Sequence, residues 1–192
     1  MHISSLTIRN FRNFENCVFK FNKGVNTIIG ENGSGKTNAF YALRILLDSK
    51  LPRYANNLSE SDFNRSLESW KGHWIVISLN FEELTADEAI QCLSFLEAGI
   101  PDGTNRGNYN YFFRPKHHIR KELFDLSDGE ERDEDALKEK LENLTIADYE
   151  YVITVGASSM DFSNDEFYKE HVGDFDELIF PNPEGAQLRF VP

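Results

Sequence analysis

One stretch of the chain combines glycines, a lysine and a threonine at a spacing that can hold phosphate. Gly30-Glu31-Asn32-Gly33-Ser34-Gly35-Lys36-Thr37 matches the pattern G-x-x-x-x-G-K-[ST]. The glycines let the backbone approach phosphates closely and turn successive N–H groups toward an anion. A helix that starts directly after them adds its positive N-terminal end. The stretch predicts a P-loop, in which Lys36 holds the β- and γ-phosphates of ATP and the Thr37 hydroxyl ligates Mg²⁺.

A P-loop needs a strand before it and a helix after it, and the sequence predicts both. Val25 to Ile29 is a short apolar run that ends at Gly30, which indicates a buried strand. Asn38 to Asp48 is predicted to be helical. Its apolar residues recur at helical spacing, at Ala39, Ala42, Leu43, Leu46 and Leu47.

The segments ahead of the loop decide between two classes of P-loop protein. Ile3 to Arg9 is predicted to be a strand, and Cys17, Phe19 and Phe21 alternate as in a second strand. We expect the two to form an antiparallel pair. A small nucleotide kinase would place its P-loop directly after the first strand and would carry an Arg-rich lid. The observed order favours an ABC-type ATPase head, in which such a pair forms a side sheet.

Further elements follow the first helix. Thr85 and Glu88 have the spacing of a capping box, which predicts a helix running to about Ala98. An acidic segment, Asp125 to Asp135, leads into an amphipathic helix. The remaining predicted strands are Ile75 to Phe81, Tyr109 to Phe113, and Tyr151 to Val155, which ends at Gly156.

Two segments resemble a known group of ATPases. Ile8-Arg9-Asn10-Phe11-Arg12-Asn13-Phe14, followed by Ile28 to Asn38, is similar to the N-terminus of the RecF and SMC class. Glu60-Ser61-Asp62-Phe63 and the strand after it resemble the overcoming-lysogenization-defect (OLD) family of ATPase-nucleases, which has relatives in phage defence. The resemblance covers Met1 to Asp48 and extends to about Leu84.

The resemblance implies an ATP-gated head that dimerises with nucleotide at its interface and serves a machine that works on DNA. It implies that Arg12 and Asn13 lie near the nucleotide, and that Asn38 belongs to the same site. It also implies that a Toprim-type nuclease and the rest of the head lie outside this chain or on a partner subunit. From the residues alone, the turn at Arg12 and Asn13 equally fits a solvated loop.

Composition indicates which partners the surface suits and in which cell compartment the protein is expected. The net charge is −12, which argues against a surface that simply coats nucleic acid. The first residues lack the apolar core of a signal peptide, and no apolar run spans a membrane, so we expect a cytoplasmic protein. Cys17 and Cys92 are far apart, and reduced thiols are expected for both.

Motifs that complete an ATPase are harder to find. Leu126-Ser127-Asp128-Gly129-Glu130 faintly echoes the ABC signature, and it also fits a solvated acidic helix start. The strand Tyr151 to Val155 runs into Gly156-Ala157 where an Asp-Glu pair would be needed. Asp176-Glu177 precedes its apolar neighbours, the reverse of the required order. His117-His118 suggests an exposed basic segment, and no histidine has metal-ligand spacing.

The sequence therefore predicts an α/β P-loop NTPase of ABC/RecF type, with a mixed sheet, antiparallel side strands and an incomplete head. We expect residues 1–82 to form the P-loop core and side sheet, residues 83–148 an insertion, and residues 149–192 a further strand and C-terminal segment. The expected function is MgATP binding with little hydrolysis by this chain alone. Two alternatives stay open, a small-molecule or nucleotide kinase and a non-catalytic nucleotide-sensing subunit.

Overall fold

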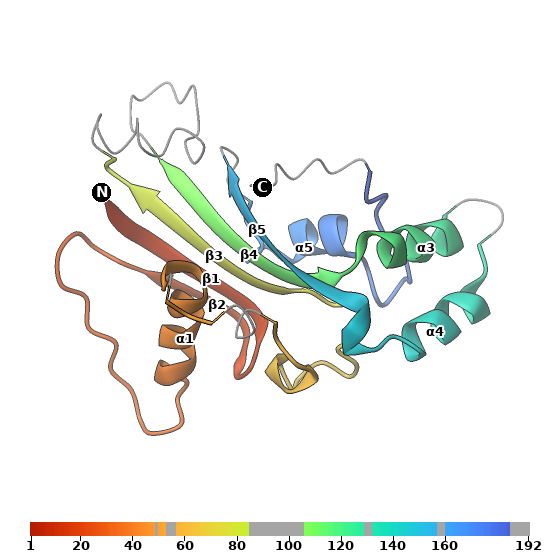
Figure 1. Cartoon of the computed structure of the whole chain (residues 1–192), viewed down its shortest axis with the longest axis horizontal. Coiled ribbons are helices and arrows are strands. Elements are labelled where there is room, and N and C mark those ends of the chain that lie inside the picture. Colours follow the sequence, from red (N-terminus) through yellow and green to blue (C-terminus); the bar gives the residue numbers. More distant parts are fainter. Residues whose placement is uncertain (49, 53–56, 85–105, 129–131, 157–159, 185–192) are drawn as a thin grey trace.

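A computed structural model describes residues 1–48, 50–52, 57–84, 106–128, 132–156 and 160–184. Its centre is a five-stranded sheet in the order β2-β1-β3-β4-β5 (Figure 1). Each pair of neighbouring strands is antiparallel. The strands are β1 (His2–Phe11), β2 (Phe14–Lys20), β3 (Ile75–Glu82), β4 (Gly107–Pro115) and β5 (Tyr149–Gly156).

Alternation along the strands builds a core on each face of the sheet. On β3, Ile75 and Ile77 face one side and are fully buried, while Trp74 just before β3 and Val76 pack into a separate cluster on the other side. This period of two follows from the pleat of a strand. A sheet that is buried on both faces needs a layer of other elements on each.

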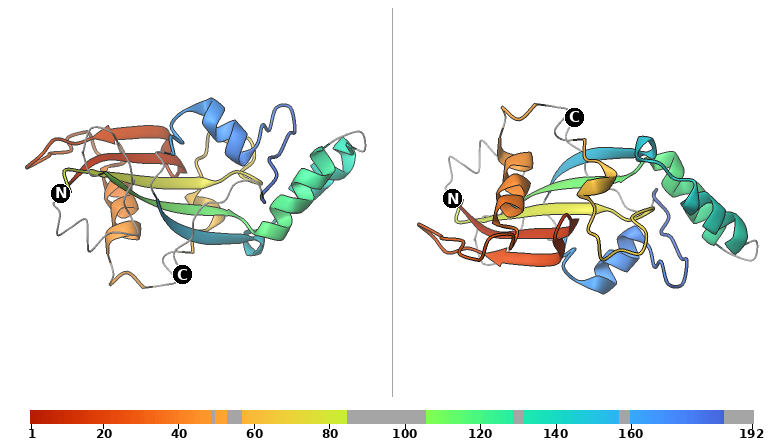
Figure 2. Two further views of the ribbon diagram at one scale, coloured as in Figure 1. Left: turned by 90° about the horizontal axis from the view of Figure 1, so that it is seen from above. Right: turned by 90° about the horizontal axis from the view of Figure 1, so that it is seen from below.

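Helices supply those layers. α1 (Lys36–Leu47) covers one face, and α5 (Asp165–Val172) lies on the opposite face (Figure 2). α3 (His117–Ser127) and α4 (Glu134–Glu142) pack together at one end of the sheet. Two short 3-10 helices, η2 (Glu60–Asp62) and η4 (Ile146–Asp148), lie in the connections. None of the helices in the described ranges is long and apolar enough to cross a membrane.

Most predicted elements are confirmed. The antiparallel pair before the P-loop is β1 and β2, and the first predicted helix is α1. The three later strands are β3, β4 and β5, and the amphipathic helix is α4, capped by the Asp133 side chain. Cys17 is a free, half-buried thiol on β2. The predicted helix from Thr85 to Ala98, and with it Cys92, lies outside the described residues.

The prediction for Val25 to Ile29 is wrong. This segment belongs to no strand, and the side chains of Val25 and Ile29 are 98% and 87% exposed. A short apolar run becomes a buried strand only where neighbouring strands pair with it. In the described part of the chain, the sheet ends at β2 and β5 and offers this segment no such place. The described sheet is accordingly antiparallel throughout, whereas a mixed sheet was predicted.

Two helices were missed. Within α3, Ile119 and Leu123 are buried, so the predicted basic segment is exposed only at residues such as His117, His118 and Lys121. Their spacing of four was a helical signal masked by the surrounding charges. α5 is capped at its N-terminus by Asn164, whose side chain accepts hydrogen bonds from the N–H groups of Glu166 and Phe167.

Candidate functional site

The P-loop joins α1 through a left-handed glycine. Gly35 is the N-cap of α1 with φ 95°, and Gly33 has φ 85°. Such backbone conformations favour glycine. The Gly35 carbonyl accepts the first bond of the helix from the Ala39 N–H at 2.9 Å. Within the loop, the Ser34 N–H donates to the Glu31 carbonyl at 3.2 Å. The loop therefore ends where the positive end of the helix dipole lies.

Lys36 folds back over the loop. Its Nζ donates to the carbonyl oxygens of Gly30 at 2.6 Å and Glu31 at 2.7 Å. The ammonium group is thus held within the arc of the loop, beside the start of α1. Thr37 lies in the first turn of α1 with an exposed side chain. The two residues predicted to hold phosphate and Mg²⁺ are brought to the same end of one helix.

The turn between β1 and β2 reaches this helix end. The Asn13 amide donates to the Ser34 carbonyl at 3.4 Å, and the Asn38 amide donates to Asn13 Oδ1 at 2.7 Å. Arg12 Nη1 donates to Asn38 Oδ1 at 3.0 Å. Arg12, Asn13 and Asn38, which are distant from one another in sequence, therefore form one polar chain along the P-loop.

Asp62 holds the arginine of this chain. Arg12 Nε donates to Asp62 Oδ1 at 2.9 Å, and the Arg12 N–H donates to the Asp62 carbonyl at 2.7 Å. Asp62 Oδ2 in turn accepts from the N–H and hydroxyl of Ser59. Phe63 is 3% exposed and anchors the segment against Trp70 and Tyr149. The sequence indicated only a family resemblance for Glu60 to Phe63, and it did not predict the contact between Asp62 and Arg12.

The hairpin turn stores backbone strain. Asn10 and Arg12 have φ values of 56° and 53°, a region that non-glycine residues rarely occupy. Asn64 stabilises both positions, because its N–H donates to the Asn10 carbonyl at 3.0 Å and its amide donates to the Arg12 carbonyl at 2.8 Å. Strained residues held by several surrounding bonds are common at functional sites. An open pocket lies beside this turn, lined by Arg12, Asn13, Asn38 and residues 61–65.

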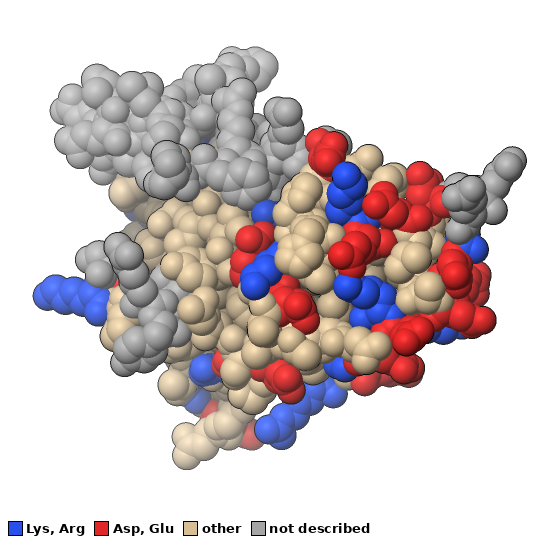
Figure 3. Space-filling view, turned by 45° about the vertical axis from the view of Figure 1, so that its right-hand side comes forward, with Lys and Arg blue, Asp and Glu red and all other residues tan. Residues whose placement is uncertain are grey.

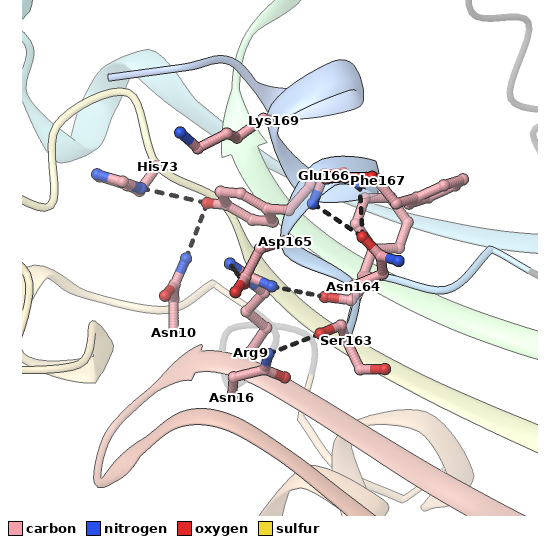
Figure 4. A network of polar contacts seen from close by, with 12 residues as sticks. Arg9, Asn10, Asn16, His73, Ser163, Asn164, Asp165, Glu166, Phe167 and Lys169 are labelled. Atoms are coloured by element: carbon pink, nitrogen blue, oxygen red, sulfur yellow. Dashed lines mark hydrogen bonds and ion pairs between the residues drawn. The ribbon is translucent and has the colours of Figure 1, made fainter. Parts of the chain in front are cut away.

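The other side of the same hairpin is fastened to α5 (Figure 4). Arg9 donates to the Phe162 carbonyl at 3.0 Å and to Asp165 Oδ1 at 2.7 Å. The buried Asn10 amide donates to the Tyr168 hydroxyl at 2.8 Å. The hairpin is therefore fixed from both faces of the sheet, which limits the positions that Arg12 and Asn13 can take.

The segments considered for signature and metal roles lie elsewhere. Ser127 ends α3, and its hydroxyl accepts a hydrogen bond from the Phe180 N–H; Gly129 and Glu130 lie outside the described residues. The N–H groups of Asp176 and Glu177 both donate to the Asp174 carboxylate in a tight turn. The described ranges contain no group of three or more His, Cys, Asp or Glu residues placed to hold a metal ion. These segments do not join the P-loop site.

Position 35 requires glycine because its φ angle is positive and because Asn13 leaves no room for a Cβ atom. A Cβ there would lie 2.1 Å from Asn13 Nδ2, so Gly35→Ala must displace Asn13 in addition to straining φ. We expect a loss of about 1–2 kcal/mol in the free energy of unfolding, measured in urea. Gly33→Ala is the matched control, because its φ is also positive but its Cβ meets nothing within 4 Å. Equal losses in the two variants would contradict a role for the Asn13 contact.

Comparison with known proteins shows to which family the chain belongs. The family model AAA_15, described as an AAA ATPase domain, matches residues 1–181. Endonuclease GajA of Bacillus cereus (strain VD045) is 33% identical over 124 residues, which cover 65% of this chain and 21% of GajA. The DNA replication and repair protein RecF of Listeria welshimeri is 44% identical over 57 residues, 30% of this chain and 15% of that protein.

A solved chain from work on ATP-driven dimerisation and DNA-stimulated activation of SMC ATPases aligns with a TM-score of 0.42 and 21% identity. It covers 59% of this chain and 64% of the other. The chain spans about a fifth of the length of GajA and less of RecF. The matches to GajA and RecF confirm the expected resemblance to OLD and RecF proteins. Because the family model covers nearly all of the sequence, the chain belongs to the AAA_15 family of AAA ATPase domains.

Proposed function

We propose that this chain binds MgATP at Gly30 to Thr37, as the N-terminal part of an ATPase head that works on DNA in the complete protein. The observation that carries the proposal is the position of the Lys36 ammonium, within the loop and beside the start of α1. Phosphate oxygens accept charge-assisted hydrogen bonds more strongly than carbonyls do. A bound triphosphate would therefore take over Lys36 from Gly30 and Glu31. The Thr37 hydroxyl would ligate the accompanying Mg²⁺.

Arg12, Asn13 and Asn38 extend the proposed site. They lie next to the loop through the bonds to Ser34 and Asn38 described above. A guanidinium group beside a P-loop is suited to charge on the terminal phosphate. We assign the three residues to contacts with the nucleotide or with groups around it.

The rest of the head is proposed to complete the sheet beside the P-loop. Val25 and Ile29 support this, because two large apolar side chains next to a binding loop are almost fully exposed. Exposed apolar surface next to a site marks a surface that another element covers. We propose that the remainder of the head, supplied by the same protein or by a partner subunit, covers the exposed side chains of Val25 and Ile29. Dimerisation with nucleotide at the interface is proposed for that complete head.

DNA contact is proposed for the complete protein and not for the surface formed by α3 and α4. Figure 3 shows Asp and Glu crowding over that end of the molecule. Exposed acids there include Glu122, Asp125, Asp128, Asp133, Glu134, Asp135, Glu139 and Glu142. Phosphate backbones are held by clustered Lys and Arg, so this surface repels DNA.

The test is equilibrium binding of ATP to the chain with and without Mg²⁺, with hydrolysis followed in the same samples. We expect Mg²⁺-dependent binding with negligible turnover, because β5 runs into Gly156 where an Asp-Glu pair would be needed. Ordinary turnover would contradict the incomplete head, and absence of binding would contradict the central proposal. Membership in an ATPase family argues against the alternative of a small-molecule kinase. Observed phosphoryl transfer to a small acceptor would restore that alternative.

Light scattering measures the molar mass with and without ATP and so tests ATP-dependent dimerisation.

Asp62 is not assigned to the nucleotide, but it positions Arg12, so its substitution tests the proposed site indirectly. We expect Asp62→Asn to weaken ATP binding by about three- to tenfold, because Arg12 loses its charged partner at 2.9 Å and its position beside Asn38. The measurement is the ATP Kd by titration calorimetry. Asp165→Asn is the matched control, since it breaks the Arg9 ion pair on the opposite face of the sheet. An unchanged Kd in Asp62→Asn would remove Arg12 from the proposed site.

A further inference from the structure

A second cavity lies on the face of the sheet opposite to α1. It has a volume of about 260 Å³ and is enclosed by α3, α5 and the segment 180–183. Trp74, directly before β3, lies in its wall. The helix that carries the P-loop is on the other side of the sheet (Figure 2). The cavity is therefore separate from the proposed ATP site.

Arg120 brings an incompletely paired guanidinium group to this cavity. Its Nε donates to the Pro115 carbonyl at 3.1 Å, and its guanidinium carbon lies 5.6 Å from the centre of the Trp74 ring. Its two terminal nitrogens form no hydrogen bond or ion pair within the described ranges. Burial lowers the pKa of Arg120 below its ordinary value, which reports the desolvation of this cation. A half-buried cation with unused donors is costly unless an acceptor reaches it.

Two arginines and two glutamates lie around Trp74 and the cavity. Arg114 is 2% exposed and lies 5.1 Å from the same ring, and Glu150 Oε1 lies 3.5 Å from its Nε. Two guanidinium groups thus share one nearby carboxylate. Glu170 also lines the cavity but is exposed and lies beyond ion-pair distance of Arg120. Glu150 also acts on Arg120 electrostatically without forming an ion pair with it, so within the described ranges the terminal nitrogens of Arg120 have no carboxylate partner.

Apolar side chains form much of the remaining lining, beside the polar residues Glu170, His171 and Asn182. Phe162, Leu123 and Phe180 are almost fully buried, and Pro115 and Pro181 complete the lining. Ligand sites of this kind combine apolar walls with a few polar groups that fix orientation. Two parallel guanidinium N–H donors match the two oxygens of a carboxylate.

We propose that this cavity is a binding site for a small aromatic carboxylate, whose carboxylate pairs with Arg120 and whose ring packs against Trp74 and Phe162. The site is independent of the P-loop. The bound carboxylate accepts hydrogen bonds from the terminal nitrogens of Arg120. The ligand therefore also connects α3 and the segment before α5 to the sheet.

The experiment titrates the full chain with phenylacetate, with its neutral analogue 2-phenylethanol and with inorganic phosphate. Trp70→Phe leaves Trp74 as the only tryptophan of the chain, so its fluorescence reports binding at the cavity. We expect saturable phenylacetate binding with a Kd below about 1 mM. Binding of 2-phenylethanol should be weaker by about tenfold or more, because a neutral group loses the charge-assisted pair. Phosphate should not displace phenylacetate.

Two variants locate the ligand. Arg120→Met keeps an apolar stem and should weaken phenylacetate binding by about tenfold or more. Lys121→Met is the matched control, because this exposed neighbour on α3 carries the same charge, and its Kd should stay within about twofold. If Arg120→Met does not fold, the Kd values of phenylacetate and 2-phenylethanol for the chain that retains Arg120 test whether the carboxylate is recognised. Absence of phenylacetate binding, equal binding of the neutral analogue, displacement by phosphate, or an equal loss in Lys121→Met would overturn the proposal.

Discussion

Lys36→Ala is expected to weaken MgATP binding by about 100-fold or more, because a triphosphate loses its direct cationic partner at the start of α1. Among the described residues, the Lys36 Nζ donates only to the Gly30 and Glu31 carbonyls of its own loop. The variant should therefore change the free energy of unfolding by no more than about 0.5 kcal/mol. The measurement is the ATP Kd at saturating Mg²⁺, with urea unfolding of the same samples.

Lys23→Ala is the control for charge alone. Lys23 is 76% exposed and pairs with Glu83, away from the P-loop contacts. Its removal should leave the Kd within about twofold, since exposed charges at this distance are screened by salt. An ATP Kd that is unchanged in Lys36→Ala, or raised equally by both variants, would refute phosphate binding by Lys36. A Lys36→Ala protein that unfolds would instead show that the lysine holds the loop together.

The second large expected effect is a loss of stability in mild acid, caused by His73. This ring, which Figure 4 shows beside the Arg9 and Asn10 network, has its Nδ1 3.3 Å from the Tyr168 hydroxyl. It also stacks on Phe175, with 3.6 Å between the ring centroids. Burial, with a smaller contribution from Arg9, lowers the pKa of His73 from 6.5 to about 4. Between these values the unfolded chain binds a proton that the folded chain does not. The contribution of His73 to stability is therefore complete above pH 6.5 and is lost as the pH falls toward 4.

The expected size of this effect is about 2 kcal/mol between pH 7 and pH 5. It is measured as the difference in the free energy of unfolding from urea titrations at the two pH values. His73→Phe keeps an aromatic ring against Phe175 and removes the titration, so it should show a difference smaller by about that amount. His118→Gln is the control, because His118 is exposed and should leave the difference as it is. A wild-type difference that persists in His73→Phe would assign the acid sensitivity to other groups.

Local patterns in the sequence determined much of this protein. The P-loop was identified from its fixed residues, because glycine, lysine and threonine have backbone and charge properties that few other residues share. The strands β1, β3 and β5 and the helix α1 followed from apolar residues at period two or at helical spacing. These elements are specified by neighbours in the chain, so one sequence suffices to predict them.

Contacts between distant segments were decided only by the tertiary structure. The sequence contained Asp62 but not its pairing with Arg12, and it contained Arg120 but not the cavity around it. Val25 to Ile29 looks like a buried strand because its residues are apolar, yet burial depends on which strands lie beside it. Each of these features requires segments far apart in the chain to meet, and the period of side chains along one segment carries no information about its partner.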